Sequence, residues 1–144
     1  MSKETGDDDR VNTLAVELRV LEGTYNDLTA RQNLLERALL ENRAALDALK
    51  GLTTDQSSEV LMQIGGGAML RAQPPSADRV LVNIGANVVI EKSREEAAAL
   101  LEGRSREMET SVVSLINQRN QIAERLEADR QLLQNLLAQS QKSE

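Results

Sequence analysis

The chain has 144 residues, a net charge of −6 and neither Cys nor His. Zinc sites built from Cys and His, thiol catalysis and His general-base catalysis are therefore excluded. The apolar residues are almost all aliphatic or Met, because the chain contains one Tyr and no Phe or Trp. Such a composition favours long helices over a compact enzyme core. The negative charge argues against a nucleic-acid-binding surface.

The first third of the chain predicts one long helix with a heptad repeat. Residues 1–9 are polar and expected to be frayed, and Asp7, Asp8 and Asp9 suit a helix N-terminus because carboxylates oppose the positive end of the dipole. Lys50 followed by Gly51 is a typical helix end. The core positions of the repeat are Val11, Leu14, Leu18, Leu21, Tyr25, Leu28, Gln32, Leu35, Leu39, Asn42, Leu46 and Leu49. A repeat of seven sustained over this length indicates a coiled coil.

The middle of the chain predicts two β-hairpins with Gly-rich turns, at residues 65–67 and 85–87. The three consecutive Gly residues of the first turn could also cradle a phosphate. No Lys-Ser/Thr pair follows them, and a strand rather than a helix comes next, so a hairpin turn is favoured. The two hairpins look like an internal repeat offset by twenty residues. Residues 53–58 are expected to form a loop, and Pro74 and Pro75 to end the second strand.

A second heptad helix is predicted after the hairpins. Ser93 and Glu96 have the spacing of a capping box at its start. Its core positions are Ala98, Leu101, Ser105, Met108, Val112, Leu115, Arg119, Ile122, Leu126, Asp129, Leu133 and Leu136. Eight charged residues on this helix are expected to lie on solvated faces rather than to form paired acids or a basic stripe. They are Glu95, Glu96, Glu107, Glu109, Arg104, Arg106, Arg125 and Arg130.

Each heptad core is too narrow for burial in a globule and needs one partner helix. The nearest partner is the other helix of the same chain, folded back antiparallel, which places Asn42 near Ser105 and Tyr25 near Arg119. Polar core residues either fix this register at some cost in stability or are solvated defects. The predicted fold class is mainly α with a small β part: two long helices in an antiparallel coiled coil flank two central β-hairpins. Residues 1–144 are expected to form one domain, with helices at about 9–50 and 94–139 and hairpins at about 59–91.

The hairpins need partners, because an isolated two-stranded hairpin is marginally stable in water and its edges invite aggregation. We expect hairpins from several chains to close a shared oligomeric β-barrel body. The residues expected to mediate this assembly are Val60, Met62, Ile64, Met69, Val80, Val82, Ile84, Val88 and Ile90.

The antiparallel arrangement brings the first turns of helix one beside the last turns of helix two. This region carries more apolar side chains than one heptad core buries. They form a thicker local core, or are scattered exposed residues, or provide an adaptable surface for unfolded chains. The residues expected to bind unfolded clients are Val11, Leu14, Val16, Leu18, Leu132, Leu133, Leu136 and Leu137.

The chain resembles the α class of prefoldin subunits over nearly its whole length. The most specific part is the pair of Gly turns, I-G-G-G-A-M-L-R-A at residues 64–72 and V-N-I-G-A-N-V-V-I-E-K-S at residues 82–93, followed by E-E-A at residues 95–97. Two hairpins point to the α class, since β-class subunits carry one.

The resemblance implies an archaeal, cytoplasmic, ATP-independent holdase without a cofactor. Its expected partners are prefoldin beta subunits in an α2β4 hexamer, unfolded protein clients held at the coiled-coil tips, and a group II chaperonin that receives them. No nucleic acid or membrane partner is expected, because no apolar run reaches the roughly 20 residues of a membrane span and the N-terminus is acidic, unlike a signal peptide. The alternative is a structural or tethering coiled-coil oligomerisation protein, while an enzyme is disfavoured by the missing His and Cys.

Overall fold

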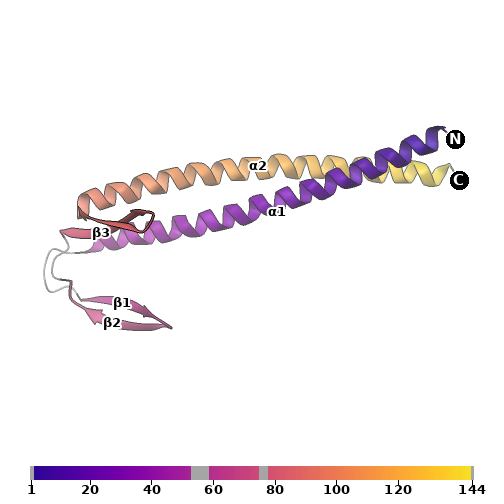
Figure 1. Ribbon diagram of the computed structural model, residues 1–144. Helices are drawn as coiled ribbons and strands as arrows, with labels where there is room; N and C mark the ends of the chain where they lie inside the picture. Colours follow the sequence, from indigo (N-terminus) through magenta and orange to yellow (C-terminus); the bar gives the residue numbers. More distant parts are fainter. Residues whose placement is uncertain (1, 53–58, 75–77, 144) are drawn as a thin grey trace. The chain divides into compact units, whose positions relative to one another are not determined.

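The computed structural model describes residues 2–52, 59–74 and 78–143. Two long helices flank four strands in the chain, which confirms the predicted fold class (Figure 1). The elements are α1 (Ser2–Gly51), β1 (Val60–Gly65), β2 (Ala68–Ala72), β3 (Arg79–Gly85), β4 (Val88–Ser93) and α2 (Arg94–Lys142). The loop predicted at residues 53–58 and Pro75 lie outside the described residues. β2 ends at Ala72, two residues before Pro74.

Both helices extend further than predicted at the free ends of the chain. α1 begins at Ser2, so the frayed segment expected before Asp9 is helical, and α2 continues to Lys142. These extensions contain no Pro, and apart from Gly6 they consist of polar residues that a helix tolerates. Carboxylates near the start of α1 and Lys142 in the last turn of α2 also complement the helix dipoles.

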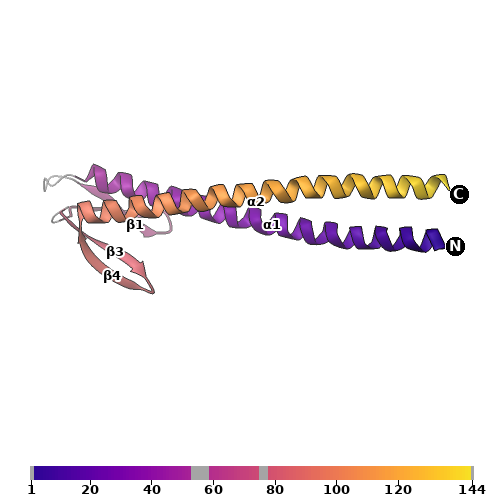
Figure 2. The same ribbon diagram turned by 90° about the horizontal axis from the view of Figure 1, so that it is seen from above.

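The chain divides into two compact units. Unit 1 combines Met1–Arg37 with Glu109–Glu144, and unit 2 is Ala38–Met108. Unit 1 therefore pairs the N-terminal part of α1 with the C-terminal part of α2, while unit 2 holds the rest of both helices and all four strands. The N- and C-termini lie together at one end of unit 1 in both views, so the helices run antiparallel as predicted (Figures 1 and 2).

The heptad cores predicted from the sequence are the cores of both units. Every predicted core position of α1 and α2 is buried or half-buried. Burying a Leu side chain contributes up to about 1.5–3 kcal/mol of apolar transfer free energy. The buried leucines are Leu14, Leu18, Leu28 and Leu126 in unit 1 and Leu39 and Leu101 in unit 2.

The two hairpins are structural repeats of each other, as predicted. β1 pairs with β2 and β3 pairs with β4, each antiparallel, and both hairpins carry an irregularity just before the turn. The first turn has Gly66 at φ 58° and Gly67 at φ 80°, and the second has Ala86 at φ 50° and Asn87 at φ 61°. Two central residues with positive φ give a type I′ turn, whose twist matches that of the strands. The Gly run is thus a hairpin turn and not a phosphate cradle.

Arg94 joins three chain segments at the base of unit 2. Its backbone N–H donates a hydrogen bond to Asp78 O at 2.9 Å, and its guanidinium donates to Leu52 O just beyond α1. The predicted capping box follows, because the Glu96 N–H donates to Ser93 Oγ at 3.1 Å. The end of α1 and the starts of β3 and α2 are therefore held together by one residue.

β3 packs against the helices of its own unit. Val82 is 9% exposed, and Arg104 Nη2 donates to Asn83 O at 2.7 Å. A hollow of about 410 Å³ between strand and helices is lined by side chains that include Leu49, Val82 and Leu101. The sequence predicts Val82 as an assembly residue, and that role stays a prediction. Within the chain, Val82 is buried in unit 2. Val82 therefore anchors β3–β4 to the helices.

Candidate functional site

The two helix ends of unit 1 lie side by side and form what we call the tip, comprising residues 5–20 and 132–143. A surface hollow of about 300 Å³ at its end is lined by residues of both helices, among them Asp7, Val11, Leu136 and Leu137. The sequence predicted this juxtaposition from the antiparallel heptads. The tip is therefore one continuous surface built from both ends of the chain.

The residues predicted to bind clients fall into three groups at the tip. Leu14 and Leu18 are buried in the heptad core, at 7% and 8% exposure. Val11, Leu133 and Leu136 are half-buried. The exposed members are Val16 at 59%, Leu132 at 44% and Leu137 at 47%, and they are joined by Val20 at 63%. The freely accessible apolar surface of the tip thus consists of Val16, Val20, Leu132 and Leu137.

Ion pairs link the two helices beside the heptad core of unit 1. Arg125 Nη2 lies 2.6 Å from Glu17 Oε1, and Arg130 Nη2 lies 3.0 Å from Glu22 Oε1. Glu17 and Arg125 each precede a core residue, Leu18 and Leu126, while Glu22 and Arg130 each follow one. Each ion pair thus joins two residues that occupy the same position relative to the core. This pairing is expected of antiparallel helices, and charges beside the core set helix orientation.

Arg125 also contacts Asp129, a buried polar core residue, through Nε at 3.2 Å. The neighbouring Glu17 and Asp129 carboxylates raise the pKa of Arg125 above its usual value. The sequence predicted a solvated face for these arginines, and they are indeed exposed, but Arg125 and Arg130 also bridge the helices. The charged residues next to core positions were the signal that identifies such bridges.

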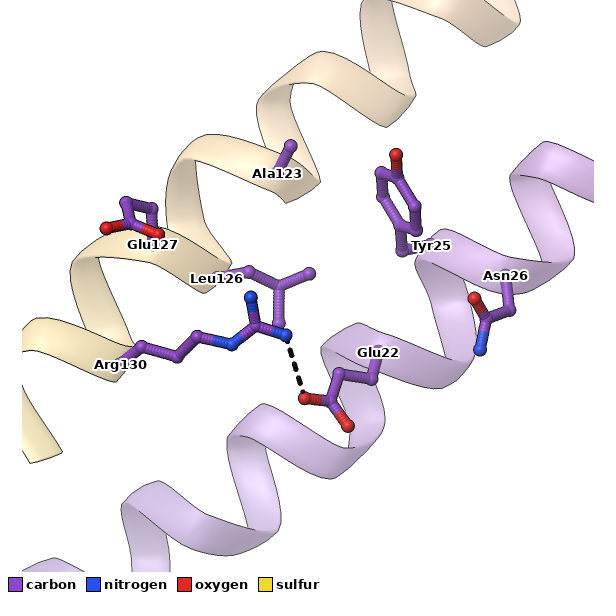
Figure 3. A pocket seen from close by; sticks show the side chains of 7 residues that line it. All are labelled: Glu22, Tyr25, Asn26, Ala123, Leu126, Glu127 and Arg130. Atoms are coloured by element: carbon purple, nitrogen blue, oxygen red, sulfur yellow. Dashed lines mark hydrogen bonds and ion pairs between the residues drawn. The ribbon is translucent and has the colours of Figure 1, made fainter.

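A hollow of about 510 Å³ lies next to these pairs and contains the single aromatic side chain (Figure 3). Figure 3 shows Glu22 and Tyr25 on α1 facing Ala123, Leu126 and Arg130 on α2. The small side chain of Ala123 leaves room beside the Tyr25 ring. Tyr25 lines this hollow together with Ala123, which lies one helical turn beyond Arg119. The predicted proximity of Tyr25 to Arg119 therefore stays a prediction.

A buried polar layer crosses the heptad core of unit 2. Asn42 Nδ2 donates to Ser105 Oγ at 2.7 Å and to Leu101 O at 2.7 Å. Asn42 and Ser105 are 8% and 7% exposed. The predicted contact between them is confirmed, and Asn42 is not a solvated defect. Buried polar pairs of this kind specify register in coiled coils.

The β1–β2 hairpin presents apolar side chains to solvent on both faces. Met62 lies opposite Leu70 on one face, and Met69 lies opposite Gln63 on the other. Met62, Met69 and Leu70 are 51%, 58% and 51% exposed, and Leu61 is 65% exposed. In the described part of the chain, β1 and β2 form a sheet with no third strand. Two unpaired edges and two apolar faces are a surface that a partner chain would cover.

The remaining predicted assembly residues are distributed over both hairpins. Val60, Val80 and Ile90 are half-buried. Ile64, Ile84 and Val88 are exposed, at 58%, 48% and 48%. These three residues lie next to the turns, Ile64 in β1–β2 and Ile84 and Val88 in β3–β4.

Across the described ranges, no three Asp or Glu side chains come together in the way that a bound metal ion requires. Neither helix, within its described residues, has a stretch apolar enough to cross a bilayer.

Two features define a coiled-coil subunit of an oligomer: antiparallel helices with exposed apolar residues at their free ends, and two-stranded hairpins with exposed apolar side chains. The family model described as "Prefoldin subunit" matches residues 21–141. The chain is 36% identical over 128 residues to prefoldin subunit alpha of Methanoregula boonei, covering 84% of each chain. It is 35% identical over 132 residues to prefoldin subunit alpha of Methanoculleus marisnigri, covering 87% of this chain and 89% of that protein.

Among solved structures, the prefoldin beta subunit from Thermococcus strain KS-1 has a TM-score of 0.62 at 16% identity, covering 88% of this chain and 90% of that chain. That likeness supports the fold. The chain therefore belongs to the prefoldin family of chaperone subunits, and its match is to the alpha class.

Proposed function

We propose that this chain is the α-class subunit of a cytoplasmic, ATP-independent holdase that assembles with β-class prefoldin subunits as an α2β4 hexamer. The observation that carries the proposal is the match to prefoldin alpha subunits over most of the chain. The two open edges and exposed apolar faces of β1–β2 support assembly with other chains. The complex holds unfolded polypeptides and passes them to a group II chaperonin.

The tip is the proposed client-binding site. Val16, Val20, Leu132 and Leu137 offer exposed aliphatic side chains, and Leu137 also lines the hollow at the end of the tip. Such surfaces can repack around many apolar segments. One tip binds weakly, because ordering a disordered client costs entropy. Several tips on one oligomer raise the avidity without new contacts.

Substitutions at the tip test this site without deleting any helix. In the tip variant, the exposed residues become polar: Val16→Ser, Val20→Ser, Leu132→Gln and Leu137→Gln. The control replaces three exposed apolar residues away from the tip: Leu34→Gln, Leu40→Gln and Val113→Ser, which are 71%, 65% and 57% exposed. Both variants leave the heptad core intact.

The assay is light scattering of a chemically denatured client diluted into the assembled complex. The tips of the companion subunits carry the equivalent polar substitutions throughout. The tip variant is expected to lose most of its protection, while the control protects like the wild type. Full protection by the tip variant would rule out the tip as the client site.

A structural or tethering coiled-coil protein is the second candidate. The continuous heptad core and the cross-helix pairs Glu17–Arg125 and Glu22–Arg130 favour it, because they make a stiff spacer. A pure tether would leave client aggregation unchanged in the scattering assay. It would also tolerate polar substitutions at the tip without loss of any activity.

A further inference from the structure

The β1–β2 hairpin carries the most exposed Met residues in the described part of the chain. The chain has four Met and no Cys. Met62 and Met69 are 51% and 58% exposed, whereas Met108 is a half-buried core residue of α2. A peroxide that reaches this chain therefore meets two open thioethers on one hairpin and no thiol.

The two thioethers lie on opposite faces of the hairpin. Met62 shares a face with its cross-strand partner Leu70, and Met69 shares the other face with Gln63. Neighbouring positions alternate between the faces of a strand. Whichever face of β1–β2 is covered in an oligomer, that face therefore contains one of these methionines.

We propose that Met62 and Met69 form an oxidation site that blocks assembly of the free subunit. The inference rests on the assembly proposed above, in which a partner chain covers β1–β2. Oxidation converts an apolar side chain into a polar one. A polar S–O group without a hydrogen-bond partner is unfavourable in a buried interface. The turn is unaffected, because its geometry depends on Gly66 and Gly67.

The reaction balances with hydrogen peroxide as the oxidant. A sulfur lone pair attacks one peroxide oxygen, the O–O bond breaks, and an S–O bond forms. The second oxygen leaves as water after proton transfer. The sulfur loses two electrons and the peroxide gains them. Methionine sulfoxide reductases, one for each sulfoxide epimer, reverse the change with electrons from a thiol reductant.

Assembly protects the two methionines from oxidation. In the free subunit both thioethers are open to solvent, so the peroxide reacts with them first. In the assembled complex the partner covers the hairpin and slows the reaction. Oxidation would thus remove unassembled subunits from the assembly reaction while existing complexes survive.

The test treats the isolated chain with hydrogen peroxide and then mixes it with the proposed β-class companion subunit from the same organism. Peptide mass mapping reports one added oxygen at each of Met62 and Met69, and a slower gain at Met108. Native mass spectrometry at a series of concentrations reports assembly. Each buried sulfoxide is expected to move the assembly midpoint to about tenfold higher subunit concentration. Treatment with both reductases should restore the original midpoint.

Two variants distinguish oxidation at Met62 and Met69 from oxidation elsewhere in the chain. The Met62→Leu, Met69→Leu chain has nearly the same side-chain volume, and it should assemble equally well with and without peroxide. The Met108→Leu chain should remain as sensitive as the wild type. Preformed complex should gain oxygen at Met62 and Met69 at least several-fold more slowly than the free chain.

Three outcomes would overturn the inference. They are normal assembly of chain oxidised at both positions, loss of assembly in the oxidised double Leu variant, and equal oxidation rates of the free and assembled chain. Failure of the untreated chain to assemble with its companion would instead refute the proposed function, and the inference with it. The untreated mixture therefore distinguishes the two failures.

Discussion

Replacement of Asn42 tests whether the buried polar layer stabilises and specifies the coiled coil. The Asn42 amide donates two hydrogen bonds of 2.7 Å, to Ser105 Oγ and Leu101 O, at a site where both side chains are buried. Asn42→Ala removes the donor and leaves the Ser105 hydroxyl without it. Losing one partner of a buried hydrogen bond costs about 1–3 kcal/mol. We expect the free energy of unfolding to fall by about 2 kcal/mol.

The double variant Asn42→Leu, Ser105→Ala should behave differently. It replaces both polar groups with apolar ones, which is often neutral or stabilising in a buried core. Its expected defect is in register, because an apolar layer no longer penalises a slip by one heptad. The single variant is therefore predicted to lose stability, and the double variant to keep stability but lose a unique register. This difference would distinguish a polar layer that specifies register from an ordinary packing contact.

Urea unfolding followed by helical circular dichroism measures the stability. Register is read with a short thiol cross-linker, because the natural chain contains no Cys. Lys50→Cys with Glu102→Cys reports the native register, in which these side chains are 3.4 Å apart. Arg43→Cys with Glu102→Cys reports a slip of seven residues. An unchanged urea midpoint for Asn42→Ala, or a double variant that cross-links only through the native pair, would refute the reasoning.

Three further predictions concern the core, the turn and the hairpin faces. Leu28→Ala, at an 8% exposed position, should lower the free energy of unfolding in urea by about 2–5 kcal/mol. Leu34→Ala, at a 71% exposed position, should lower it by under about 0.5 kcal/mol. Equal losses for the two variants would contradict the proposed core. Gly66→Ala should destabilise β1–β2 by about 1 kcal/mol through backbone strain alone, since no atom lies within 4 Å of the added carbon. The hairpin amides should then exchange their hydrogens faster, and unchanged exchange would argue against the turn geometry. Val82→Asp should unfold unit 2 because it buries an unpaired charge. Leu81→Asp, at the 74% exposed neighbouring position, should leave the thermal unfolding curve measured by circular dichroism unchanged. Matching curves for the two variants would show that Val82 is not anchored as described.

The coiled coil was predictable because its signal is local and repeated. Each core position of the two heptads is buried or half-buried, including the polar members Gln32, Asn42 and Asp129. The hairpin turns were equally readable, since Gly and Asn are the residues that adopt positive φ. Ala86 at φ 50° shows that the second turn keeps this geometry even without Gly at that position.

The features that the sequence did not resolve depend on contacts between distant segments. Val80, Leu81 and Val82 are consecutive apolar residues, so alternation alone does not reveal which face of β3 meets the helices. The cross-helix pair Glu17–Arg125 becomes visible only once the two heptads are aligned antiparallel. The client and assembly surfaces depend on other chains, so exposure within one chain identifies accessible residues without identifying what covers them.

We propose that this chain belongs to a complex that keeps unfolded proteins from aggregating without nucleotide. The most direct test is the light scattering of a chemically denatured protein diluted into buffer that contains the complete complex and no ATP. We predict that scattering is suppressed at concentrations near one complex per client molecule. Scattering equal to that of the client alone, from a complex whose assembly is verified by native mass, would contradict the claim.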